Sequence, residues 1–409
     1  MEQKHKLTLG IIGGGQLAQM LAQNNPFHDL KVVILSDQKD CPAALTDAQL
    51  VIGSLNDREA VKKFFEQIQI LTIENEFVDS ELLGEMKDSF ERVLFFPSIG
   101  AIEVTQNKLS QKFLFEKLGL PTAPFVAFQR EADVVLPWLQ KTFEKFPSGF
   151  MLKKAFGGYD GKGNFKVGGL KDFAEATAFI EDTLTKGSTV YAEELVFFSK
   201  ELAQIYVRGL KQDFISYPVV ISEQEKNVCR LVYGPATEFG VSAELEKQTT
   251  EIGNKIATHL NFVGTFAIEY FLTKDGRVLI NEMAPRVHNS GHYTLDASPD
   301  NQFANHVRAI LGAPLKQPAT YSFFAMRNIL GTQGITKDFK FDVQKLWDKA
   351  VLPENKEDLK IYWYGKSKTA PYRKLGHINT IAMTKEDLLR KIDLLNKTET
   401  AFWKSVETV

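Results

Sequence analysis

Residues 266–286 read FAIEYFLTKDGRVLINEMAPR. The turn residues KDG lie between two apolar runs, which predicts a β-hairpin. Pairing the two strands about this turn brings Glu269 roughly opposite Asn281 and Glu282. Two carboxylates and a carboxamide then converge, and such oxygen donors suit Mg²⁺, which takes its remaining ligands from water and nucleotide phosphates. We therefore expect Glu269 and Glu282 to be magnesium ligands.

A solvated surface hairpin is the alternative to this metal site. Side chains alternate between the two faces of a strand, so Asn281 and Glu282 are expected on opposite faces, with one of them pointing away. Glu269, however, is embedded among aromatic and aliphatic neighbours in the sequence. An unpaired carboxylate is costly in such surroundings, which favours the metal site.

A cluster of polar residues, APRVHNSGH at 284–292, follows the hairpin directly. Residues of these types have no packing reason to gather on a loop, so the cluster indicates function. Arg286 carries a planar fork that matches a phosphate or a carboxylate. His288, taken alone, fits a structural imidazole as well as a functional one.

The composition is that of an ordinary soluble enzyme with more than one domain. The chain has 409 residues, which is more than a single core usually holds. Hydrophobic residues make up 44% and charged residues 24%, as in ordinary globular proteins. A formal charge of -2 offers no basic surface for nucleic acid. The sequence has neither an apolar stretch long enough to span a membrane nor a convincing secretory signal. Cys41 and Cys229 lack the spacing of a metal site or a disulfide scaffold, which favours a reducing cytoplasm.

The order of apolar patterns predicts an α/β region followed by an α+β region. Strand and helix patterns alternate over the first hundred residues, which predicts a parallel sheet covered on both faces. One long helix is expected over IEVTQNKLSQKFLFEKLGL, residues 102–120, ending at Gly119 and Pro121. Antiparallel strands with two helices are expected from there to about residue 315, and short strands with a closing amphipathic helix after it.

A glycine cluster, GIIGGGQLAQM at residues 10–20, follows the first strand and opens a helix. Backbone amides at a helix start bind anions with help from the helix dipole. Gly13, Gly15 and Ala18 match the dinucleotide-binding fingerprint in its alanine form. Asp37 follows at about the sequence distance at which this fingerprint has an acid that binds the ribose. A nicotinamide-dependent oxidoreductase is therefore an open alternative, as is a tight turn with Asp37 as a cap.

Together these segments resemble the ATP-grasp ligases, and more specifically the 5-(carboxyamino)imidazole ribonucleotide synthase family of purine biosynthesis. The resemblance covers nearly the whole chain and includes two further motifs, FGGYDGKGN at 156–164 and RKLGHIN at 373–379. It implies a Rossmann-like parallel-sheet domain (1–105), an ATP-grasp domain (106–315) and a small C-terminal β/α domain (316–409). It also implies a homodimer. Another carboxylating or formylating ligase and a catalytically silent nucleotide-binding protein are the remaining alternatives.

The resemblance implies an ATP site. Lys153 would neutralise phosphates, and the glycine loop would close over them. The strand from residue 193 to 196 would read adenine with its backbone groups, and Glu201 would accept hydrogen bonds from the ribose hydroxyls. Lys108 stands where the family usually has arginine, and Gln224 where it usually has histidine. Ala155 and Phe156 replace the basic residues common before the loop. The implied nucleotide-binding residues are Lys108, Lys153, Gly158, Tyr159, Asp160, Gly161, Lys162, Gly163, Asn164, Glu193, Glu194, Leu195, Val196, Glu201, Gln224, Asn281 and Glu282.

The second substrate implied is aminoimidazole ribonucleotide, with its phosphate at the loop from residue 14 to 17. Bicarbonate would attack ATP to give carboxyphosphate, with Lys153 and Arg286 stabilising charge and Asp160 acting on the acceptor amine. The implied substrate-binding residues are Gly14, Gly15, Gln16, Leu17, Glu74, Glu76, Tyr159, Asp160, Arg286, His288, Asn289, Arg373 and Lys374.

Overall fold

The computed structural model describes residues 7–157, 163–319, 323–332, 343–351 and 356–407. Its first part is a parallel sheet of strand order β3-β2-β1-β4-β5, which confirms the α/β pattern predicted for this region. Asp57 begins α2 by accepting hydrogen bonds from the amides of Glu59 and Ala60. The elements are β1 (Thr8–Ile12), α1 (Gln16–Gln23), β2 (Lys31–Ser36), β3 (Gln49–Ile52), α2 (Arg58–Phe65), β4 (Ile70–Ile73), α3 (Ser80–Ser89) and β5 (Leu94–Phe95).

The long helix expected over residues 102–120 is wrong in one respect, because two helices stand there. α4 (Ile99–Gln106) ends before Asn107, and α5 (Lys108–Lys117) begins after it. Asn107 has an extended backbone, and its side chain accepts hydrogen bonds from two amides of α5. Asparagine favours this capping position, so the chain turns there rather than continuing the helix. Asn107 also pairs with Phe156, which ties α5 to the start of the glycine loop.

A small antiparallel sheet of order β6-β9-β7-β8 follows. Its strands are β6 (Phe125–Ala127), β7 (Phe150–Lys154), β8 (Asn164–Val167) and β9 (Val190–Glu194). α6 (Val135–Lys145) and α7 (Phe173–Thr185) bury Trp138 and Ile180 against Phe150. This packing fixes β7 and β9, the two strands that carry candidate nucleotide-binding residues.

A large antiparallel sheet runs in the order β15-β14-β10-β12-β13-β16-β18-β17, with β11 beside β10. Because β16 pairs with β13, the C-terminal strands continue this sheet rather than forming a separate one. The strands are β10 (Phe198–Arg208), β11 (Phe214–Ser216), β12 (Val220–Glu225), β13 (Val228–Gly234), β14 (Gly264–Thr273), β15 (Val278–Ala284), β16 (Phe323–Leu330), β17 (Lys360–Trp363) and β18 (Lys374–Ala382).

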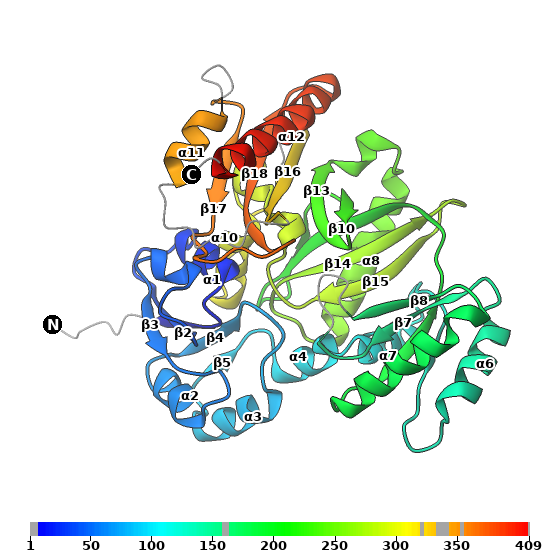
Figure 1. Ribbon diagram of the computed structural model, residues 1–409. Helices are drawn as coiled ribbons and strands as arrows, with labels where there is room; N and C mark the ends of the chain where they lie inside the picture. The colour runs from blue at the N-terminus through cyan, green and yellow to red at the C-terminus, as the bar shows by residue number, and fades with distance from the viewer. Residues whose placement is uncertain (1–6, 158–162, 320–322, 333–342, 352–355, 408–409) are drawn as a thin grey trace.

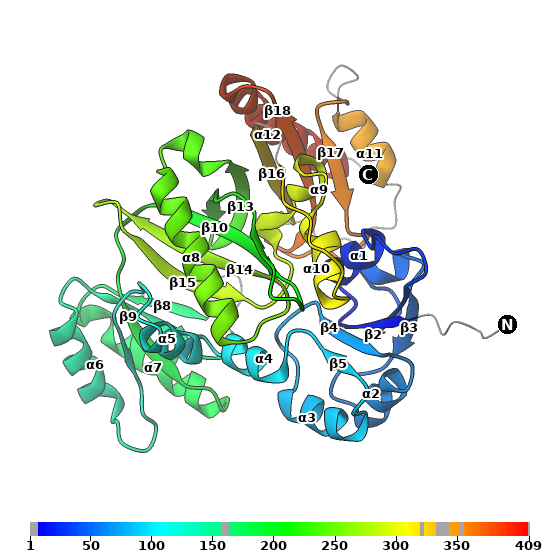
Figure 2. The ribbon, with the colours of Figure 1, turned by 180° about the vertical axis from the view of Figure 1, so that it is seen from behind.

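Helices cover the large sheet and join it to the parallel sheet. α8 lies across one face, as the view from behind shows (Figure 2). α10 packs against β14 and against α1, so the parallel sheet and the large sheet share a core (Figure 1). The helices are α8 (Ala243–His259), α9 (Thr294–Ala297), α10 (Gln302–Ile310), α11 (Val343–Ala350) and α12 (Lys385–Glu407), with 3-10 turns at Pro42–Leu45, Leu170–Asp172, Ala236–Phe239 and Asn289–Gly291.

None of the helices in the described ranges combines the length and the apolar composition that crossing a bilayer requires.

Candidate active site

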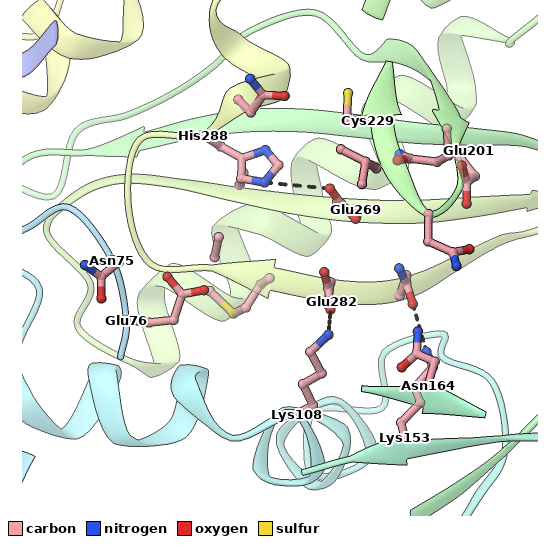
Figure 3. A pocket seen from close by; sticks show the side chains of 18 of the residues that line it. Asn75, Glu76, Lys108, Lys153, Asn164, Glu201, Cys229, Glu269, Glu282 and His288 are labelled. Carbon is pink, nitrogen blue, oxygen red and sulfur yellow. Dashed lines mark hydrogen bonds and ion pairs between the residues drawn. The ribbon is translucent and has the colours of Figure 1, made fainter. Parts of the chain in front are cut away.

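A cavity of about 1160 Å³ lies where the three sheets meet. Acidic strands of the large sheet face Lys108 and Lys153 across it (Figure 3). The cavity brings together most of the site residues expected from the sequence. These are Gln16, Leu17, Glu74, Glu76, Lys108, Lys153, Asn164, Glu193, Glu194, Leu195, Val196, Glu201, Gln224, Glu269, Asn281, Glu282, Arg286, His288, Asn289, Arg373 and Lys374.

Some expected site residues are not among those that line the cavity. Gly14, Gly15 and Gly163 do not line it. The carbonyl of Gly163 accepts a hydrogen bond from the amide of Lys154, which continues the pairing of β7 and β8. The predictions for Gly158, Tyr159, Asp160, Gly161 and Lys162 lie outside the described residues.

The acidic hairpin carries a β-bulge that the sequence did not reveal. Glu269 of β14 pairs with Glu282 of β15, but Tyr270 pairs with Ile280, so Asn281 is an extra residue in β15. Such a bulge re-aims side chains that strict alternation would separate. The expectation that Asn281 or Glu282 points away is therefore wrong, and both line the cavity with Glu269.

The pKa values of the two hairpin carboxylates are shifted in opposite directions. Burial, with the nearby Glu282 carboxylate, raises the pKa of Glu269 to about 8. Burial alone would also raise the pKa of Glu282, but the Lys108 ammonium, 2.5 Å from its Oε2 atom, holds that pKa below the ordinary value. Burial likewise raises the pKa of Glu201 to about 7. Nearby positive charges thus do not offset the burial of the Glu269 and Glu201 carboxylates.

This donor set fits Mg²⁺. Two facing carboxylates and the Asn281 carboxamide are hard oxygen ligands, and a divalent cation supplies the charge that Glu269 lacks. No group of three His, Cys, Asp or Glu side chains gathers as a closed metal cage among the residues that the structure describes. Mg²⁺ does not require such a cage, because it usually completes its shell with water and substrate phosphates.

Lys153 lies beside the acidic hairpin and contacts two side chains. Its Nζ atom is 2.6 Å from Oε1 of Glu193 and donates to Oδ1 of Asn281 at 3.0 Å. The other carboxylate oxygen of Glu193 is 2.5 Å from Nζ of Lys112. Sequence reasoning missed Lys112, although its spacing places it on one helix face between Lys108 and the core residue Phe115.

Arg286 and His288 have definite partners in the cavity. Arg286 forms a two-point ion pair with Glu76, with Nε to Oε2 at 2.6 Å and Nη2 to Oε1 at 3.2 Å, which joins the loop after β15 to the parallel-sheet region. Burial, then the charges of Arg286 and Lys374, lower the pKa of His288 well below its ordinary value. His288 is therefore a neutral imidazole at physiological pH, with Nδ1 2.8 Å from Oγ of Ser290.

The amides at the start of α1 are occupied by a carboxylate. The amide of Gly15 donates to Oε1 of Glu74 at 2.6 Å, and the amide of Ala18 donates to Oε2 at 3.2 Å. Gly13 has a φ of +102°, and a Cβ added there would lie 2.4 Å from Cγ of Glu74. The glycines thus admit the Glu74 side chain, so a substrate phosphate at the loop from residue 14 to 17 would have to displace it.

Basic residues gather instead where the C-terminal segment reaches the cavity. Lys366 lines it together with Arg373 and Lys374. The Nζ atom of Lys366 donates to the carbonyl of Lys374 at 2.7 Å and lies 5.6 Å from the centre of the Tyr364 ring. Sequence reasoning missed Lys366, although it stands in the basic segment KIYWYGKSK that precedes RKLGHIN.

Comparison with known proteins places this arrangement in a class. The ATP-grasp domain family matches residues 113–303, the ribonucleotide synthetase preATP-grasp domain residues 6–106, and the phosphoribosylaminoimidazole carboxylase C-terminal domain residues 325–391. The fold is that of an ATP-grasp enzyme. N5-carboxyaminoimidazole ribonucleotide synthase of Bacillus subtilis is 32% identical over 386 residues, which cover 94% of each chain. The same enzyme of Synechocystis is 33% identical over 91% of this chain and 92% of its own.

Solved structures agree with this comparison. Carboxyaminoimidazole ribonucleotide synthase of Aspergillus clavatus complexed with ATP has a TM-score of 0.84 and 32% identity over 97% of this chain and 99% of its own. The same organism's N5-carboxyaminoimidazole synthase, in complex with ADP and 5-aminoimidazole ribonucleotide, has a TM-score of 0.82 and 31% identity over 97% and 99%. This chain belongs to the N5-carboxyaminoimidazole ribonucleotide synthase family.

Proposed function

We propose that this chain carboxylates the exocyclic amine of 5-aminoimidazole ribonucleotide with ATP and bicarbonate. The products are N5-carboxyaminoimidazole ribonucleotide, ADP and phosphate, in purine biosynthesis. Family membership makes the chain an ATP-dependent carbon–nitrogen ligase and replaces the nicotinamide alternative. The observation that carries the proposal is the single cavity in which Lys153 and the acidic hairpin meet the Glu76–Arg286 pair.

ATP is proposed to bind between the small sheet and the large sheet. Lys153 contacts its phosphates, backbone groups of the segment from residue 193 to 196 read adenine, and Glu201 accepts hydrogen bonds from the ribose. Glu269 and Glu282 hold Mg²⁺, with Asn281 beside them. When bound, this ion neutralises phosphate charge. Lys108, now paired with Glu282, is then available to the nucleotide.

The chemistry begins when a bicarbonate oxygen attacks the γ-phosphorus of ATP and breaks its bond to ADP. Lys153 and Arg286 stabilise the oxygens that gain charge. The resulting carboxyphosphate collapses to CO₂ and phosphate, and the exocyclic amine captures the CO₂ and loses a proton. Exclusion of water from the cavity during the reaction would limit hydrolysis of the intermediate. Asp160 remains our candidate to receive that proton, and full ribonucleotide-dependent turnover by an Asp160→Asn variant would refute this role.

The acceptor ribonucleotide is proposed to lie on the side of the parallel sheet. Its phosphate is placed at Lys366 and Arg373 in this revised proposal, because Glu74 takes the helix amides first expected to bind it. Glu74 and Glu76 then face the ribose or the amine as hydrogen-bond acceptors. The remaining substrate-side candidates are Gln16, Leu17, Tyr159, His288, Asn289 and Lys374.

Three broader expectations accompany this function. The division into 1–105, 106–315 and 316–409 remains our proposal for the domains. A homodimer and a cytoplasmic setting are likewise proposed, the first from the family resemblance and the second from the composition. Size-exclusion chromatography with light scattering tests the dimer.

The decisive experiment measures ADP release with ATP and bicarbonate, with and without 5-aminoimidazole ribonucleotide. Stimulation by this ribonucleotide and formation of its carboxylated product are expected. A nucleotide turnover that ignores this ribonucleotide but responds to another amine would instead favour a ligase of different specificity on the same fold.

A further inference from the structure

Lys112 is a buried lysine that does not reach the cavity. It projects from α5, and its side chain is only 1% exposed. Its Nζ atom lies 2.5 Å from Oε2 of Glu193, donates to Oγ1 of Thr122 at 2.5 Å, and is 5.6 Å from the centre of the Phe125 ring. An ammonium group is costly to bury, and it persists only where opposite charge and hydrogen bonds compensate it. The contacts of Lys112 therefore make one specific charge pair in the interior.

Glu193 divides its two oxygens between two lysines. Oε1 faces Lys153 at 2.6 Å, and Oε2 faces Lys112. Burial would raise the pKa of Glu193, but these two ammonium groups hold it below the ordinary value, so the carboxylate is ionised. Two positive charges thus flank one negative charge, and the three side chains carry a formal charge of +1.

This count matters for the nucleotide. Without Lys112, Glu193 would neutralise Lys153, and the pair would present no net charge to a phosphate. Charges act strongly on one another in a buried, weakly screened environment, so one additional charge changes the potential at Lys153 substantially. We propose that Lys112 is a positioning residue that offsets the charge of Glu193, so that Lys153 acts on the nucleotide phosphates as an uncompensated cation. This inference rests on the proposed function, because it requires a nucleotide at Lys153.

A charge series tests the inference by calorimetric titration with ADP and Mg²⁺. Lys112→Met brings the formal charge to zero and is expected to weaken ADP binding about tenfold. Glu193→Gln raises the charge and leaves the backbone groups of residue 193, which are proposed to read adenine, in place. It is expected to bind ADP at least as tightly as the parent. The double variant Lys112→Met with Glu193→Gln restores the original charge, and its affinity is expected within about twofold of the parent. In steady-state assays, Lys112→Met raises the KM for ATP but leaves the KM for the ribonucleotide unchanged.

Two control variants separate charge from packing. Lys112→Arg keeps the charge and is expected to bind ADP nearly as the parent does. Lys391→Met removes another buried lysine, which pairs with Asp358 at 2.7 Å and Asp387 at 3.2 Å away from the cavity. It is expected to lower the melting temperature without changing ADP affinity, because it alters no charge near the nucleotide.

Equal ADP binding by the parent and by folded Lys112→Met would overturn the inference. So would a folded double variant that binds as weakly as Lys112→Met. If Lys112→Met does not fold, Glu193→Gln and the double variant still decide, because a tenfold loss in either one contradicts the charge count. A parent protein that binds no ADP would instead contradict the proposed function, and this inference with it.

Discussion

The side chain of Gln302, on α10, forms hydrogen bonds with both the backbone amide and the backbone carbonyl of His288. The amide of His288 donates to Oε1 of Gln302 at 2.9 Å, and Nε2 of Gln302 donates to the carbonyl of His288 at 2.8 Å. Gln302 is fully buried, and a Cβ added at Gly291 would lie 2.8 Å from its carboxamide. The glycine of the NSGH segment therefore leaves room for the side chain that sets the position of His288.

Replacing Gln302 with leucine is expected to impair the acceptor side of the site. The change leaves two partly buried backbone groups of His288 without partners, which costs up to about 1–3 kcal/mol for each group. We expect kcat/KM for the ribonucleotide to fall about tenfold or more, with ADP affinity unchanged.

Gln111 provides a matched control for that variant. It holds Met283, next to Glu282, by the same two hydrogen bonds, at 2.8 Å and 3.0 Å. Gln111→Leu is expected to weaken ADP binding in the presence of Mg²⁺ while sparing the KM for the ribonucleotide. If Gln302→Leu and Gln111→Leu each impair ADP binding and ribonucleotide use to the same extent, the two glutamines act through the general stability of the protein. They then do not act through the local positions of His288 and Met283.

Removing either carboxylate of the hairpin is expected to abolish the response to Mg²⁺. In the parent protein, Mg²⁺ with ADP should raise the melting temperature, because ligands that bind only the folded state stabilise it. Glu269→Gln and Glu282→Gln should lose this shift and lower turnover by about 100-fold. Glu91→Gln is the control, because Glu91 is exposed and far from the hairpin in the sequence. A full Mg²⁺-dependent shift in both hairpin variants would refute the assignment of the metal ligands.

The revised position of the acceptor phosphate is tested by removing charge near the C-terminal segment. Arg373→Met and Lys366→Met should each raise the KM for the ribonucleotide about tenfold, without changing ADP affinity, because a charge-assisted hydrogen bond to phosphate is lost. Lys368→Met is the control, since Lys368 is exposed on the same segment and does not line the cavity. An unchanged KM in both variants would return the phosphate to the start of α1.

His306 is expected to make stability depend on pH below neutrality. Its Nδ1 atom accepts from the amide of Thr265 at 3.0 Å, and its Nε2 atom lies 2.9 Å from Oγ1 of Thr72, so the folded protein holds the neutral ring. Burial lowers the pKa of His306 from 6.5 to about 4. Between these values the unfolded chain binds a proton that the folded chain does not, so the free energy of unfolding falls as the pH falls.

This contribution should lower the free energy of unfolding by about 2 kcal/mol between pH 7 and pH 5. Urea denaturation at the two pH values measures it. His306→Gln should be less stable at pH 7 and lose less stability on acidification, because glutamine does not titrate there. Burial lowers the pKa of His377 in the same direction, so the comparison is between variant and parent rather than with zero. An identical pH dependence in both proteins would contradict the prediction.

Patterns of local origin could be predicted from the sequence. The parallel sheet and the acidic hairpin follow from apolar periodicity and turn residues, and the family follows from the motifs. The bulge at Asn281 was not predicted, because it depends on which partner the backbone meets. The break at Asn107 was not predicted either, although the capping tendency of asparagine is a local signal for it. Asn107 pairs with Phe156, and the extra residue in β15 is defined only by its pairing with β14.

The sequence by itself determined the family and the residue types of the site, since short motifs carry the groups that the chemistry requires. Only the tertiary structure decided what each charge meets: Glu74 at the amides of α1, Lys112 behind Glu193, and Glu76 against Arg286. The reason is physical. A charge in a folded protein acts on neighbours within a few ångströms, and these partners lie 56 to 210 residues apart in the chain, so nothing in the local sequence specifies them.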